Sequence, residues 1–167
     1  MRQTLIIFTL LGAWLLGGCS NYQLGDRVEM PFKSVYVAPI INRSFAPQAE
    51  VILANQVIED LNRSGQVKTG DKYSDVSLKI ILIDYQRGVT ATRPQDTQVA
   101  RAYNLTLTAQ VTLINNKTGE VYIERREIST SQQAFTEGGF IQSEYQAMPV
   151  LTRKLAQEIT EQVLGAW

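Results

Sequence analysis

Apolar and polar residues alternate along two segments of the chain, which is the pattern of a half-buried β-strand. Residues 103–114 place Tyr, Leu, Ala or Val at every second position, with Asn, Thr or Gln between them. Residues 75–85 alternate at first and become apolar on both faces at Ile81 and Ile83. The pattern predicts two strands of a sheet that has one polar face. At the end of residues 75–85, where both faces of the strand are apolar, both faces should be covered.

Two further strands are expected on either side of this pair. Residues 32–40 are rich in residues that favour strands and end near Pro39, which lacks a backbone donor. The turn cluster 115–119 joins residues 103–114 to residues 120–129, so these two segments should form a hairpin. Alternation falters at Arg125 and Arg126, which predicts a β-bulge that leaves both arginines accessible.

Two amphipathic helices are predicted from apolar residues at a spacing of four. The first helix extends from about Pro47 to Ser64 and stops at Gly65. The second extends from about Pro149 to Leu164; Ser143 offers an earlier start, in which case Pro149 would kink the helix. The core-facing positions are Ala49, Leu53, Val57 and Leu61, and Leu151, Leu155, Ile159 and Val163.

The element order β-α-β-β-β-α defines the expected fold class. Antiparallel hairpins and two one-sided helices indicate an α+β two-layer sandwich. In this fold, two helices pack on one face of a mainly antiparallel four-stranded sheet.

Two long connections remain between these elements. Residues 86–102 contain Arg87, Arg93 and Arg101, with Asp96 as their one acidic residue. Connections of this length are often functional, and guanidinium groups suit phosphate oxygens, so an anionic glycolipid head group is a candidate ligand. Solvated loop arginines are the alternative at each position.

Residues 130–142 form the second long connection. They carry Phe135, Phe140 and Ile141 around Gly138 and Gly139. These apolar side chains either pack under the domain or form a contact surface.

The N-terminus has the pattern of a secretory signal: Met1 and Arg2 are followed by an apolar run of about 12 residues, which is shorter than a membrane span. Leu16 to Cys19 ("LGGC") resembles the lipoprotein box of bacterial lipoproteins, whose cysteine is joined to diacylglycerol and acylated after cleavage. We therefore expect a signal peptide at 1–18, a palmitate-type acylated residue at Cys19, a tether at 19–31 and one domain at 32–167.

Several acyl chains would hold Cys19 stably at a membrane. The alternative is a free or buried cysteine after an ordinary signal peptide, and no second cysteine is present to pair with it. Ser20 follows the cysteine, and by resemblance to the sorting rule of enterobacterial lipoproteins this favours the outer membrane.

Composition narrows the function classes. The 167 residues are 44% apolar and carry 16 basic and 16 acidic side chains, so nothing indicates a nucleic-acid partner. No histidine is present, and acylation would consume the single cysteine. We expect no enzyme, metal site or cofactor; scattered carboxylates such as Asp84, Asp96 and Glu137 leave a folded acid-base pair as the alternative.

The mature chain resembles the lipopolysaccharide-assembly lipoprotein family LptE. The lipoprotein box carries part of this resemblance. The other segments, in the family's order, are "MPFKSVYV" at 30–37, "PIINRSF" at 39–45, "IDYQR" at 83–87, "ARAYNLTLTAQVTL" at 100–113 and "NKTGEVYIERREIS" at 116–129.

This resemblance implies a non-enzymatic outer-membrane lipoprotein whose body faces the periplasm or the lumen of a partner barrel. It would plug the large β-barrel LptD, help to assemble it, and take part in lipopolysaccharide transport and insertion into the outer leaflet. In enterobacterial members, basic residues near the hairpin tip contact lipopolysaccharide, which points to Arg93 or Arg101. A further basic residue expected after the last strand is missing from "SQQAFTEGGF".

Two other function classes share the remaining features. One is a periplasm-facing lipoprotein adaptor of another envelope assembly or of a peptidoglycan-associated machine. The other is a periplasmic enzyme.

Overall fold

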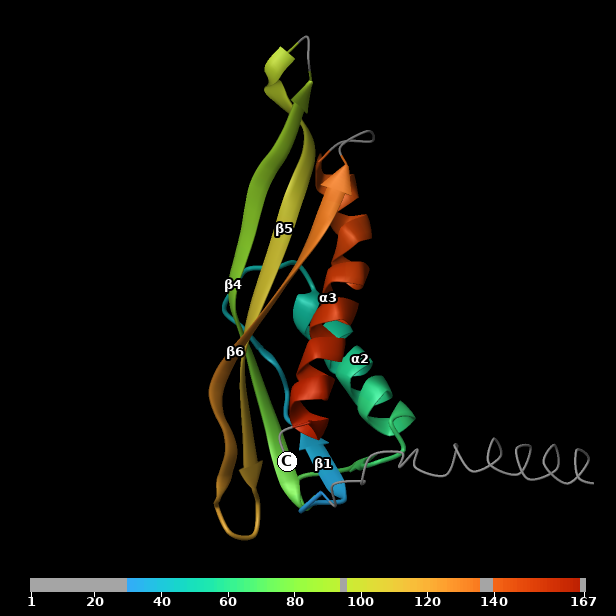
Figure 1. The fold of residues 1–167 in the computed structure, drawn as a ribbon, viewed down its shortest axis with the longest axis vertical. Coiled ribbons are helices and arrows are strands. Elements are labelled where there is room, and N and C mark those ends of the chain that lie inside the picture. The colour runs from blue at the N-terminus through green and yellow to red at the C-terminus, as the bar shows by residue number, and fades with distance from the viewer. Residues whose placement is uncertain (1–29, 94–95, 136–139, 166–167) are drawn as a thin grey trace, which may run out of the picture.

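The computed structural model describes residues 30–93, 96–135 and 140–165, with the side chains of 91–101 and 140 left out. The expected signal peptide, Cys19 and most of the tether lie outside these residues. The elements are β1 Ser34–Val37, β2 Ile41–Asn42, α2 Ala49–Arg63, β3 Lys68–Thr69, β4 Val76–Arg93, β5 Asp96–Asn115, β6 Val121–Phe135 and α3 Phe140–Leu164. Both helices lie on the same face of one sheet (Figure 1).

The sheet has six strands in the order β3-β1-β4-β5-β6, with β2 also paired to β4. The long strands β4, β5 and β6 are antiparallel neighbours, whereas β1 and β2 pair with β4 in parallel. The predicted α+β class and the two helices are confirmed, but the predicted count of four strands is wrong. The additional strands β2 and β3 have two residues each and are too short to show a period.

Helix α2 confirms the first predicted helix with slightly shorter ends. All four core-facing positions of the predicted stripe are buried under the sheet. Pro47 precedes the helix by two residues instead of forming its first position. Gly65 follows its end with φ of 67°, a conformation that glycine adopts without steric strain.

Helix α3 is longer at its start than the helix predicted from Pro149. It begins at Phe140 and includes Pro149 in its interior. Ser143, Glu144, Ala147 and Met148 are all buried in the added turns, so the inward face continues upstream of the proline. This burial offsets the hydrogen bond that proline cannot donate.

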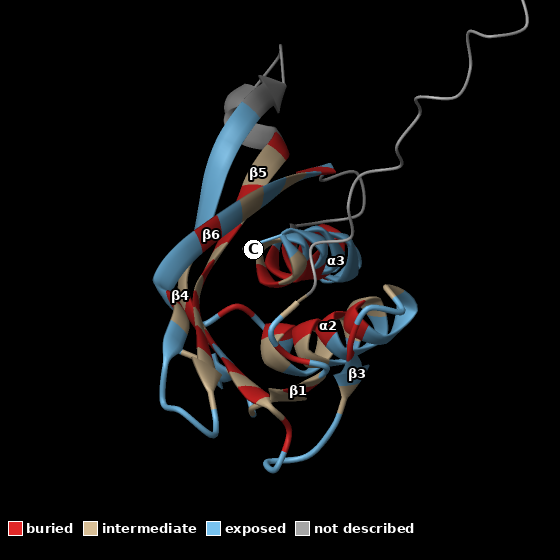
Figure 2. Cartoon of the chain, turned by 60° about the horizontal axis from the view of Figure 1, so that its bottom comes forward, coloured by how far each residue is buried: buried red, intermediate tan, exposed pale blue. Residues whose placement is uncertain are grey.

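The core lies between the helices and one face of the strands, as the buried residues in Figure 2 show. The predicted bulge in β6 is confirmed: Val111 pairs with Arg126 but Leu113 pairs with Ile123, so β6 contains an extra residue. Arg125 has φ of 42° there, and both arginines are exposed.

The two predicted long connections are wrong, because the strands and α3 occupy most of both. β4 and β5 run on as far as Arg93 and Asp96, and β6 continues to Phe135. The side chains of Phe135 and Ile141 are exposed, in agreement with the contact-surface alternative. Gly138 and Gly139 lie outside the described residues.

Candidate functional site

The far end of the β4–β5 hairpin projects beyond the helices (Figure 1). We call residues 86–93 and 96–104 the arm. Its strands stay paired from Gly88 and Asn104 to Arg93 and Asp96. Five consecutive residues, 86–90, are exposed, so neither face of β4 is covered over this stretch.

Pairing within the hairpin forms the arm, since burial does not hold its first five residues. Val89, Thr90 and Thr92 favour extended backbone, and each strand satisfies backbone groups of the other. The register shifts three times between Val89 and Arg93. Such irregularities bend and twist a ribbon and are common next to functional sites.

A polar cluster joins the base of the arm to α3. The Glu144 Oε1 atom accepts hydrogen bonds from the Tyr85 hydroxyl at 2.6 Å and from Arg87 Nε at 2.9 Å. A second guanidinium nitrogen of Arg87 lies 2.6 Å from the same oxygen. The Arg87 guanidinium also lies 5.2 Å from the centre of the Tyr85 ring, within cation–π range.

Burial differs strongly between the partners in this cluster. The Glu144 side chain is 8% exposed and the Arg87 side chain is 45% exposed. Burial, followed by the hydrogen bond to Glu144, raises the pKa of Tyr85 above its usual value. Burial alone would lower the pKa of Arg87, but its interactions with Tyr85 and Glu144 outweigh that effect and raise the pKa. The cluster therefore keeps a neutral phenol and a paired guanidinium at neutral pH.

The structure does not bring the three candidate arginines into one cluster. Arg93 ends β4, and its backbone is in register with Asp96. Arg101 is the extra residue of β5 between the Thr92–Ala100 and Ala91–Ala102 pairs. Arg87 lies six residues before Arg93 on the same strand, roughly 20 Å away at the rise of a β-strand. Arg93 and Arg101 thus belong to the outer arm, and Arg87 to its base.

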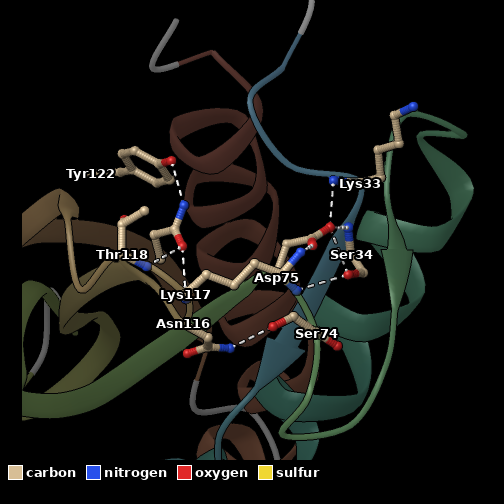
Figure 3. A network of polar contacts seen from close by, with 9 residues as sticks. Lys33, Ser34, Ser74, Asp75, Asn116, Lys117, Thr118 and Tyr122 are labelled. Carbon is tan, nitrogen blue, oxygen red and sulfur yellow. Dashed lines mark hydrogen bonds and ion pairs between the residues drawn. The ribbon is translucent and has the colours of Figure 1, made fainter.

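A second polar network lies at the start of β4, the end of this strand away from the arm. Figure 3 shows its contacts. The Asp75 carboxylate accepts hydrogen bonds from the backbone amides of Lys33 and Ser34, both at 3.1 Å, and from the Ser34 hydroxyl at 2.9 Å. Lys117 donates to its other oxygen at 2.8 Å. This network ties the start of β1, the start of β4 and the β5–β6 turn together.

The hydrogen bond from Lys117 is the main cause that lowers the pKa of Asp75 below its usual range, followed by the bonds from Lys33 and Ser34. Asn116 reinforces the same junction, because its side chain donates to the Ser74 carbonyl at 2.7 Å. The partners of Asp75 are two backbone amides, a hydroxyl and an ammonium group. Because these groups hold three separate segments together, we assign the network to stability.

Neither polar network has the form of a catalytic centre. Within the described ranges, no three His, Cys, Asp or Glu residues are grouped so that they could hold a metal ion. Asp84 accepts a hydrogen bond from Gln86 at 2.7 Å and is half-buried, next to the base of the arm. In those same ranges, neither helix combines the length and apolar character needed to cross a membrane.

Sequence reasoning missed Glu144, Tyr85 and Asp75 as organising residues. Glu144 is 57 residues from Arg87, and Asp75 is 41 residues from Ser34. The one local signal was Ser143, which marked an earlier start for the second helix. No spacing rule connects such distant partners.

Solved structures with the same fold come from several bacteria. The chain matches a protein of the DUF330 family from Xanthomonas campestris with a TM-score of 0.62, at 12% identity over 83% of this chain and 86% of that one. It matches a minor lipoprotein from Acinetobacter baumannii with a TM-score of 0.55, at 16% identity over 81% and 95%. These likenesses establish the fold alone.

A third structure, the lipoprotein B from Nitrosomonas europaea, gives a TM-score of 0.51 at 16% identity over 83% of this chain and 86% of that one. No curated protein matches the chain significantly. The profile of the family described as "LptE: Lipopolysaccharide-assembly" matches residues 32–163, which include α2, the whole sheet with the arm, and all of α3 except its last residue. The chain therefore belongs to the LptE lipopolysaccharide-assembly family.

Proposed function

We propose that this chain is an outer-membrane lipoprotein that plugs and helps to assemble an LptD β-barrel, and that it takes part in lipopolysaccharide transport and insertion into the outer leaflet. The observation that carries this proposal is the family match over residues 32–163. The LptE family consists of non-enzymatic lipopolysaccharide-assembly lipoproteins. The expected mature protein begins at Cys19, whose acyl chains would hold it at the membrane.

Structural neighbours support the lipid-anchor part of the proposal. The Acinetobacter and Nitrosomonas proteins are both described as lipoproteins. The lipoprotein box at Leu16 to Cys19 is the matching feature of this chain. The tether proposed at 19–31 would link this cysteine to the folded domain.

We place the lipopolysaccharide contact on the outer arm, at Arg93 and Arg101. Two guanidinium groups on a ribbon without covering helices suit the phosphates of an anionic glycolipid head group. Arg87 remains part of the proposed site but with a smaller share, because Glu144 already neutralises it. The body supplies a rigid base for the arm through the Tyr85–Arg87–Glu144 cluster.

The test is purification of the tagged, acylated full-length protein in mild detergent, with identification of any partner present in stoichiometric amount. The proposal expects a large β-barrel whose complex with this chain resists SDS. A Cys19→Ala variant is the control for the anchor and should leave the outer-membrane fraction. Recovery of the chain alone, or with peptidoglycan-associated proteins, would contradict the barrel role and favour the adaptor class.

A further inference from the structure

Phe45 is exposed between two buried residues of a short loop. The loop joins β2 to α2, and the Phe45 side chain is 93% exposed. Its neighbours on both sides, Ser44 and Ala46, are buried. The chain is therefore buried immediately before and after Phe45, which is the exposed aromatic residue of this loop.

Side-chain hydrogen bonds fix the shape of this loop. Asn42 Nδ2 donates to the Ala46 carbonyl at 2.8 Å and to Glu50 at 2.7 Å. The Asn42 Oδ1 atom accepts hydrogen bonds from the backbone amide of Ser44 at 3.1 Å and from its hydroxyl at 2.8 Å. These bonds join Asn42 to both neighbours of Phe45 and so restrain the backbone on either side of it.

A contact with α3 holds the second half of the loop. The Tyr145 hydroxyl donates to Gln48 Oε1 at 2.9 Å. Val51, one turn of helix further along α2, is also exposed, as is the Tyr145 ring. Both helices thus carry an exposed apolar side chain close to Gln48, at the end of the loop.

The backbone at Phe45 is strained. Its φ is 61°, in the left-handed region that glycine and asparagine tolerate and that bulky residues avoid. Solvation also disfavours a fully exposed phenyl ring. Strain of this kind persists only where the surrounding structure imposes it, and it is concentrated at binding and active sites.

We propose that Phe45 is an aromatic anchor that inserts into an apolar pocket of a protein partner. A ring held rigidly in its bound position loses little conformational freedom on association, and such aromatic anchors carry a large share of interface energy. The identity of the partner rests on the proposed function, which makes it the inner wall of the β-barrel.

The surroundings of Phe45 fit a protein pocket and not a lipid surface. Arg43 and Gln48 are exposed polar residues of the same loop and Glu50 follows in the first turn of α2, so charged and polar groups accompany the apolar residue, as at the rim of a protein interface. Attachment to a lipid surface uses a broad apolar helix face with several basic residues. Here Arg43 is the one basic residue within the loop, and Glu50 lies close behind it.

Phe45→Asn tests the anchor, because asparagine tolerates the left-handed backbone but lacks the ring. The variant should unfold at a temperature about 3–5 °C higher, since strain is relieved. In the mild-detergent purification it should recover at least about tenfold less barrel than the wild type, the loss expected for an interface anchor. Phe45→Tyr keeps the ring and should recover as much barrel as the wild type.

Tyr73→Asn is the matched control, because it removes another aromatic ring that is 79% exposed, next to the distant Asp75 network. It should leave barrel recovery unchanged. Equal recovery by wild type and Phe45→Asn would overturn the anchor and leave the proposed function standing. A wild type that recovers no barrel would overturn the proposed function itself and remove the partner assigned to Phe45.

Two other results would also overturn the anchor. A Phe45→Asn variant that unfolds at a lower temperature would show that the loop needs the ring for its own fold. A variant that keeps the barrel but no longer floats with lipopolysaccharide-containing vesicles would assign Phe45 to lipid.

Discussion

The two halves of the β4–β5 hairpin contain the same two strands but are stabilised differently. In the half over the helices, every second residue of β4 from Val76 to Leu82 is buried. In the arm, residues 86–90 are all exposed. The first half is fixed by what its side chains bury, and the second by strand pairing and by the contact of Arg87 with Glu144.

This difference separates the scaffold from the proposed ligand site. Substitutions in the helix-covered half disturb a close-packed core, whereas the exposed residues 86–90 of the arm have no core to disturb. An arm of this kind can carry charges for a ligand at little cost in stability. The following substitutions test that separation.

Leu155→Ala and Val89→Ala should give the largest contrast. Leu155 is fully buried on α3, so its truncation should lower the free energy of unfolding by about 3 kcal/mol. Val89 is exposed on the arm, and its truncation should change that free energy by less than about 0.5 kcal/mol. Urea unfolding at neutral pH measures both values, and similar losses would contradict the separation.

Asp75→Ala should lower the free energy of unfolding by about 2 kcal/mol at pH 7, because it removes the charge-assisted hydrogen bonds that join the starts of β1 and β4 to the β5–β6 turn. The folded-state pKa of Asp75 is depressed, so its stabilisation is full above the unfolded pKa and is lost as the pH falls below about 4. Wild type and variant should therefore converge in acid.

Urea unfolding at several pH values checks this convergence. Glu124→Ala, which removes an exposed carboxylate from β6, is the matched control and should show no such trend. A gap between wild type and Asp75→Ala that stays constant to pH 2 would argue against the network.

Glu144→Ala should lower the free energy of unfolding by about 1 kcal/mol, since the half-exposed Arg87 can rehydrate. The local effect should be clearer. Amide hydrogen exchange near Tyr85 and Arg87 should become faster, while exchange in the helix-covered half of β4, from Val76 to Leu82, stays slow. A double-mutant cycle with Arg87→Met isolates the coupling of the pair. Strict additivity would show that the cluster does not hold the arm.

Periodic burial explains which elements could be predicted from the sequence. The stripes in α2 and in the second half of α3 place one residue per turn in the core, and the alternation of β5 places every second residue there. The bulge at Arg125 and Arg126 was also predictable, because it interrupts that alternation. Each of these signals arises because one face of the helix or strand is buried and the apolar positions repeat with the period of that element.

The parts that could not be predicted lack such a signal. β2 and β3 are two residues long, and the arm buries neither face of residues 86–90, so its residues look like a loop. The first turns of α3 were missed because proline is disfavoured inside a helix, so the helix was predicted to begin at Pro149. Ala147 and Met148, just before the proline, are nevertheless buried. At the candidate site the arginines were visible in the sequence, but the partner of Arg87 was not.

The most direct test of the account is lipopolysaccharide binding by an Arg93→Ala/Arg101→Ala double variant, measured as a function of salt. Loss of two guanidinium contacts should weaken binding at least about tenfold and flatten its salt dependence, with the unfolding temperature unchanged. Arg63→Ala/Arg153→Ala, which removes two exposed arginines from the helices, should bind like the wild type. Unchanged binding by a folded Arg93→Ala/Arg101→Ala variant would contradict the assignment of the ligand contact to the arm.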